Sequence, residues 1–216
     1  MTWVKAGIYF AYFPLLVACM YVVGRWWQLQ GVVKVYAGFI LLTGAVQFSS
    51  FFLSLWGINN LPILHFYVPV GFGMLCWFYS KVMHGFIAAK TWWWAGSVFA
   101  VFSILNSILW EPVFTFNAVA LSVESLLVVI LALSAFVLLL NENVRTQKWD
   151  TLRSISVFNS GILIYFASNL LLYHNGTIIM EKLSVYGSHA TWLIHSFFAS
   201  IFYFSFIAGL WTRPQI

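Results

Sequence analysis

Seven long apolar runs constrain the fold of this chain more than any other feature of its sequence. Each run contains roughly 20 residues, the length with which an α-helix crosses a hydrocarbon layer about 30 Å thick. Short polar or turn-rich breaks separate the runs, which cover residues 6–24, 34–57, 63–80, 91–110, 118–140, 155–173 and 190–211. The sequence therefore predicts an all-α, polytopic integral membrane protein in which residues 1–216 form a single seven-helix bundle.

The composition supports this class and argues against several others. Charged residues make up 7% of the 216 residues, whereas ordinary soluble domains contain about 25%. Ten Lys and Arg residues in total are too few to line a phosphate-binding face, so no nucleic-acid partner is predicted. Cys19 and Cys76 fall in different apolar runs, where a thiol behaves as a small hydrophobic group.

The basic residues indicate how the bundle is oriented. Eight of the ten Lys and Arg lie on one side of the predicted bundle, and only Lys5 and Lys182 lie on the other. Because cytoplasmic loops carry the excess of basic residues, we expect the N-terminus outside and the C-terminus inside. Membrane lipids are the expected partners of these charges. The basic break at residues 141–153 is the expected docking surface for a membrane or cytoplasmic signalling partner.

Glu124 is the one acidic residue inside a predicted span. It lies about 9 Å from the outer end of the fifth run, at a rise of about 1.5 Å per residue. An ionisable group at this depth is costly, so it indicates a functional site and needs a partner. No Lys or Arg lies at its level, which leaves His65 and His195. Two arrangements satisfy the carboxylate: a Glu–His pair that shares a proton, or a metal ion held by all three residues.

Other polar residues have a similar depth when each helix is counted from its outer end. Asn106, Asn169 and His195 lie four to five residues from that end, at about 1.5 Å per residue, and Tyr165 is one turn from Asn169 on the same face. We predict a ligand-binding site with Glu124 at its centre and five orienting partners: His65, His195, Asn106, Tyr165 and Asn169. For a single Asn the alternative is a structural hydrogen bond between helices.

Four motifs carry a resemblance to a known family. They are residues 64–67 (LHFY), 115–117 (TFN) with 124–125 (ES), 159–166 (NSGILIYF) and 192–196 (WLIHS). In these motifs, and over nearly its whole length, the chain resembles a family of short, largely uncharacterised seven-helix membrane proteins of Bacteroidota. The resemblance implies the seven-helix architecture and a multi-pass location in the bacterial inner membrane. It implies no activity.

Two better-known seven-helix classes fit the sequence less well. Microbial rhodopsins bind retinal through a Schiff base to a Lys in the middle of the last helix, and residues 199–203 contain no Lys. Ceramidase-like zinc hydrolases use three His with an Asp and a Ser, whereas the last apolar run here has a single His. A metal-dependent hydrolase would therefore need the set His65, Glu124 and His195, with an open position for water.

Three functions follow from these observations, and the sequence favours the first. In this first interpretation the chain is a sensor-like or ligand-binding, receptor-like membrane protein whose pocket opens to the outside. The alternatives are a membrane-embedded metal-dependent hydrolase and a small-molecule or proton-coupled transporter. Transporters commonly contain internal repeats, and none is evident here. The sequence predicts no catalytic residue and identifies no cofactor, a metal ion being the one candidate.

Overall fold

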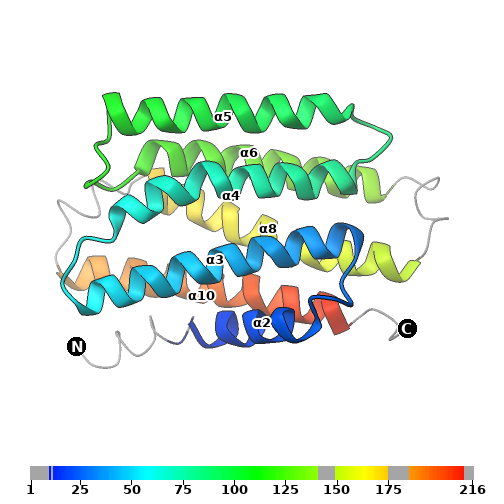
Figure 1. Ribbon diagram of the computed structural model, residues 1–216, viewed down its shortest axis with the longest axis horizontal. Coiled ribbons are helices and arrows are strands. Elements are labelled where there is room, and N and C mark those ends of the chain that lie inside the picture. The colour runs from blue at the N-terminus through cyan, green and yellow to red at the C-terminus, as the bar shows by residue number, and fades with distance from the viewer. Residues whose placement is uncertain (1–9, 11, 141–148, 175–184, 212–216) are drawn as a thin grey trace. The chain divides into compact units, whose positions relative to one another are not determined.

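The computed structural model describes residues 10, 12–140, 149–174 and 185–211 (Figure 1). This part of the chain forms seven α-helices and no β-strand. The helices are α2 (Tyr12–Arg25), α3 (Gly31–Leu55), α4 (Leu61–Val82), α5 (Ala89–Leu109), α6 (Ala118–Leu139), α8 (Trp149–His174) and α10 (Val185–Trp211). The prediction of an all-α fold is confirmed.

Six of these helices, α3 to α10, are long and apolar enough to cross a membrane. Each contains at least 21 residues, and the hydrocarbon layer requires about 20. The seventh helix, α2, is apolar and has 14 described residues; the predicted start of its run, at residues 6–9, lies outside the described residues. The protein is thus a multi-pass helical membrane protein.

Two helices begin more than one turn earlier than the sequence predicts. Helix α8 begins at Trp149 and α10 at Val185, whereas the apolar runs begin at residues 155 and 190. Asp150, which the sequence places in a break, is therefore helical. The prediction located only the part of each helix that suits hydrocarbon, but backbone hydrogen bonding continues until a residue stops it, and residues 149–154 contain neither Gly nor Pro. Residues 141–148 of the proposed docking surface lie outside the described residues.

The end of α3 shows how local sequence terminates these helices. The Ile58 N–H bonds to the Leu53 carbonyl at 2.9 Å, and the Gly57 N–H bonds to the Ser54 carbonyl at 3.2 Å. These two bonds form a Schellman motif, which needs a left-handed residue at its centre. Gly57 supplies it with φ +69°, a conformation that is strained for residues with a Cβ atom.

The chain divides into two compact units. Unit 1 comprises Met1–Met20 and Ser125–Ile216, and unit 2 comprises Tyr21–Glu124. Unit 1 contains α8, α10 and most of α6, whereas unit 2 contains α3, α4 and α5. The single continuous bundle stays a prediction.

In unit 2, α4 packs between α3 and α5 through aromatic side chains. The rings of Tyr36 on α3 and Phe78 on α4 lie 5.0 Å apart between centroids. On the other side of α4, Phe72 lies 4.3 Å from Phe99 of α5. All four side chains are buried, so aromatic contacts form the core of this unit.

In unit 1, α8 and α10 pack closely because two glycines face bulkier residues of the other helix. A Cβ atom on Gly161 of α8 would lie 2.6 Å from the Cβ of Ser205 on α10. A Cβ atom on Gly209 of α10 would collide with the ring of Phe158 on α8. Small residues at such positions let helix backbones approach closely in a membrane.

Candidate functional site

The six predicted site residues are divided equally between the two units. His65, Asn106 and Glu124 belong to unit 2, on α4, α5 and α6, and Tyr165, Asn169 and His195 belong to unit 1, on α8 and α10. The structure brings the three residues of unit 1 into contact. In unit 2, His65 and Asn106 have partners other than those the sequence predicts.

His195 and Asn169 form the central contact in unit 1. The Nδ1 atom of His195 lies 2.8 Å from the Oδ1 atom of Asn169. An amide oxygen only accepts hydrogen bonds, so Nδ1 carries a proton and donates it to Asn169. In neutral imidazole the other nitrogen is then an acceptor. This contact therefore makes Nε2 of His195 the basic, lone-pair-bearing atom of the ring.

Three aromatic rings surround the His195 ring. The centroid distances are 5.8 Å to Tyr165, 6.1 Å to Tyr173 and 5.6 Å to Trp192, which packs edge-to-face at an interplanar angle of 84°. Helical spacing explains this grouping, because residues three or four apart share a face. We call this group the His195 cluster: Tyr165, Asn169, Tyr173, Trp192 and His195.

Asn169 retains an unused donor inside the cluster. Its side chain is 0% exposed, and its Nδ2 atom has no hydrogen-bond partner within the described part of the chain. A buried donor without a partner costs about 1–3 kcal/mol. Such a group in a native structure calls for an explanation, of which a bound molecule is one.

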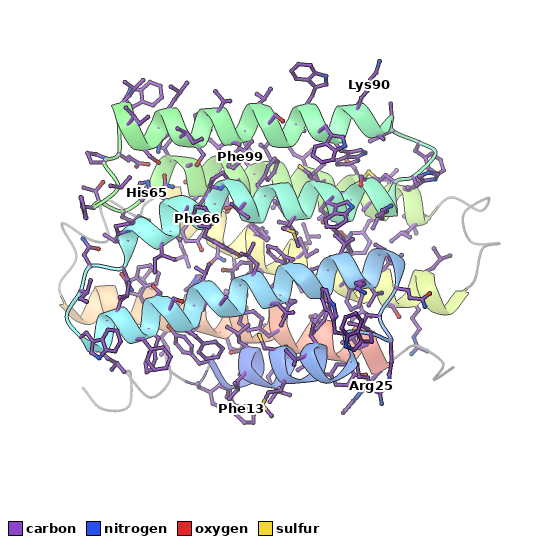
Figure 2. All side chains as sticks on the ribbon, viewed as in Figure 1. Phe13, Arg25, His65, Phe66, Lys90 and Phe99 are labelled. Atoms are coloured by element: carbon purple, nitrogen blue, oxygen red, sulfur yellow. The ribbon has the colours of Figure 1, made fainter. Side chains whose placement is uncertain are left out.

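His65 of unit 2, labelled on α4 in Figure 2, uses both ring nitrogens in contacts with other parts of the same unit. Its Nδ1 atom lies 2.7 Å from Oγ of Ser107 on α5, and its Nε2 atom lies 3.0 Å from the backbone carbonyl oxygen of Thr115. A carbonyl only accepts, so Nε2 donates. Both ring nitrogens of His65 are thus bonded to groups other than the Glu124 carboxyl, and its part in a site centred on Glu124 stays a prediction. Similar depth along the helix axes suggested that His65 pairs with Glu124. Whether two side chains meet also depends on the direction in which each one points around its own axis.

Asn106 supports the start of α6. Its Nδ2 atom donates to Oε2 of Glu111 at 2.8 Å and to Oδ1 of Asn117 at 3.0 Å. The Glu111 carboxylate in turn accepts the backbone N–H of Val119 at 3.0 Å. A carboxylate at this position satisfies a free N–H of the first helical turn and interacts favourably with the helix dipole. In these contacts the role of Asn106 is structural. A structural hydrogen bond is the alternative to ligand binding that applies to a single Asn.

The sequence did not predict four of these polar partners, which are Ser107, Glu111, Thr115 and Asn117. One signal was available, because Asn directly before an apolar run is a common residue at the start of a helix, and Asn117 precedes Ala118, the first residue of α6. Thr115 contributes a backbone carbonyl, which no side-chain pattern identifies.

Glu124 is buried, with 3% of its surface exposed. Cys76 of α4, in the same unit, is close enough for an electrostatic interaction with it. Within the described part of unit 2 the Glu124 carboxyl makes no hydrogen bond. The predicted central position of Glu124 among the orienting residues stays a prediction.

The described residues contain no group of three or more His, Cys, Asp or Glu side chains that could hold a metal ion. His65 also offers no free ring nitrogen to a metal, because both nitrogens contact protein oxygens. The ligand set His65, Glu124 and His195, and the hydrolase alternative that depends on it, stay predictions.

Comparison with known proteins adds no further constraint. No family model, no curated protein and no solved structure matches the chain. The resemblance to a Bacteroidota family therefore stays a prediction.

Proposed function

We propose that the protein is a sensor-like, ligand-binding protein of the bacterial inner membrane and that the His195 cluster is its binding site. One observation carries the proposal. Asn169 fixes the protonated nitrogen of His195, while Nε2 makes no hydrogen bond within the described part of unit 1. A side chain held in one orientation with a free acceptor is typical of a binding residue.

The surroundings of His195 favour binding over a purely structural role. A structural histidine inside a membrane protein uses both nitrogens, as His65 does with Ser107 and Thr115. The His195 cluster instead combines a free acceptor, the unused Asn169 donor and three aromatic rings. An apolar surround with a few oriented polar groups is the usual composition of a small-molecule site.

The direction of access follows from the predicted orientation. His195 lies close to the start of the membrane-spanning part of α10, which begins at Thr191. With the N-terminus outside, this end of α10 faces the outside. The ligand therefore enters from that side, and the inner loops transmit binding to a signalling partner. No observation specifically favours transport or hydrolysis.

The test is co-purification of the ligand. We expect native mass spectrometry of the purified protein to detect a bound small molecule that is absent from the His195→Phe variant. His84→Phe is the matched control, because His84 is exposed in the connection after α4. Asn169→Leu, which removes both the orienting acceptor and the unused donor, should also lose the molecule.

Folding of each variant is checked by size-exclusion chromatography and thermal denaturation. If His195→Phe does not fold, His195→Gln replaces it, because glutamine keeps the polarity without the ring nitrogen. A bound molecule retained at full occupancy in both His195 variants would overturn the proposal, as would a wild-type protein that carries no molecule in any preparation.

A further inference from the structure

We infer that the ligand of the His195 cluster is a hydroxylated aromatic ring of the quinol class, a lipid-soluble molecule with a hydroxyl-bearing headgroup. The inference rests on the proposed function and specifies its ligand. It is carried by the polarity of the two unused hydrogen-bonding atoms, by the aromatic surround and by the apolar exposed residues at the same level of α10.

The hydrogen-bonding polarity restricts the chemistry of the ligand. Nε2 of His195 accepts, because Nδ1 donates to Asn169 at 2.8 Å, so the ligand must present an O–H or N–H group. Nδ2 of Asn169 is a buried donor without a partner among the described residues, so the ligand must also present an acceptor. A hydroxyl group both donates and accepts. Ligands with acceptors alone, such as phosphate esters or quinones, satisfy Asn169 but not His195.

The surround favours an aromatic body for the same ligand. Tyr165, Tyr173 and Trp192 already pack around the imidazole at 5.6–6.1 Å between centroids, in the range in which rings arrange edge-to-face or offset. A planar ring adds to such an arrangement at small entropic cost. A sugar, with hydroxyls on every side, would leave most of them unpaired here.

The part of α10 that contains His195 borders lipid on its other faces, which indicates that the ligand reaches the cluster from a lipid environment. Leu193, Ile194 and Phe197 are exposed to 38%, 50% and 62% of their surface, and all three lie in the membrane-spanning part of α10. An apolar surface of this kind faces hydrocarbon in a membrane. A quinol matches it, because its hydroxylated ring suits the polar cluster and its alkyl tail suits the lipid.

The experiment compares two probes that differ in hydrogen-bond donors. Decylubiquinol and decylubiquinone have the same ring substituents and tail, but only the reduced form carries hydroxyl groups. Both are titrated anaerobically into the protein in phosphatidylcholine–phosphatidylglycerol nanodiscs, and binding is measured by microscale thermophoresis. We expect the quinol to bind at least tenfold more tightly than the quinone.

Three variants locate the effect. His195→Phe should lose the preference for the quinol, Asn169→Leu should weaken binding of both forms, and His84→Phe should bind both as the wild type does. A preference for the quinol that persists in His195→Phe would overturn the inference, because Nε2 of His195 would then not be the atom that accepts the hydroxyl hydrogen bond.

The outcomes also separate this inference from the proposed function. If both forms bind equally, or neither binds while a different molecule co-purifies in a His195-dependent manner, the ligand class is wrong and the binding site stands. If neither form binds and nothing co-purifies, both the inference and the proposed function are wrong.

Discussion

Replacing Gly161 by alanine tests how closely α8 and α10 must pack. A Cβ atom at this position would lie 2.6 Å from the Cβ and 2.9 Å from the Oγ of Ser205. Carbon atoms in contact lie about 3.5–4.0 Å apart, so the two helices would have to separate locally by about 1 Å. The Ser205 Cβ is attached directly to the backbone and cannot rotate away. The collision can therefore be relieved only by moving the α8 and α10 backbones apart.

The expected cost combines two opposing effects. Overpacking a close contact typically costs about 1–3 kcal/mol, whereas alanine is favoured over glycine in a helix by about 1 kcal/mol. The net loss in the free energy of unfolding is therefore about 0–2 kcal/mol. Gly73→Ala in α4 isolates the packing effect, because a Cβ atom there has no atom within 4 Å of it. The difference between the two variants should be about 1–3 kcal/mol.

The assay is reversible unfolding in mixed micelles of dodecyl maltoside and dodecyl sulfate, followed by circular dichroism. Gly161→Ala should unfold at a lower dodecyl sulfate fraction than the wild type or the same one, and Gly73→Ala at a higher fraction. Gly209→Ala, whose Cβ would collide with the Phe158 ring, should behave like Gly161→Ala. If Gly161→Ala is as stable as Gly73→Ala, the close approach of α8 and α10 does not exist as described.

Two further predictions concern unit 2, and both are measured by the same unfolding assay. Glu111→Ala removes the carboxylate that accepts the Val119 N–H, and we expect a loss of about 0.5–2 kcal/mol, as for other helix caps; unchanged stability would show that the carboxylate does not cap α6. His65→Phe leaves the Thr115 carbonyl without its donor and should cost about 1–3 kcal/mol. The exposed His84→Phe should be neutral, and equal stability of the two His variants would contradict the contacts of His65.

The membrane-spanning helices are the part of the fold that the sequence predicts best. A bilayer fixes the length and the apolar character of each span, so composition alone identifies them. The early starts of α8 and α10, at Trp149 and Val185, were not predicted because the added turns are not apolar. A hydropathy pattern locates the hydrocarbon boundary, whereas hydrogen bonding and capping locate the end of a helix.

The sequence located part of the candidate site for a geometric reason. Tyr165 and Asn169 share a face because they are four residues apart, and consecutive helices of opposite direction place residues of equal depth, such as His195, at the same level. Depth along the helix axis, however, does not determine the direction in which a side chain points around that axis. The side chain of His65 reaches Ser107 and the Thr115 carbonyl instead of Glu124, and neither rotation about a helix axis nor the path of a connection can be obtained from a single sequence.

The glycine contacts of unit 1 have a mechanical consequence for the His195 cluster. Gly161 and Gly209 let α8 and α10 approach closely, while the cluster joins the same two helices further along through a hydrogen bond and aromatic rings. Two helices that are held close together at one end change their crossing angle when a molecule separates them at the other end. A ligand seated beside His195 would change the crossing angle of α8 and α10, and the tilt would grow with distance from the glycines.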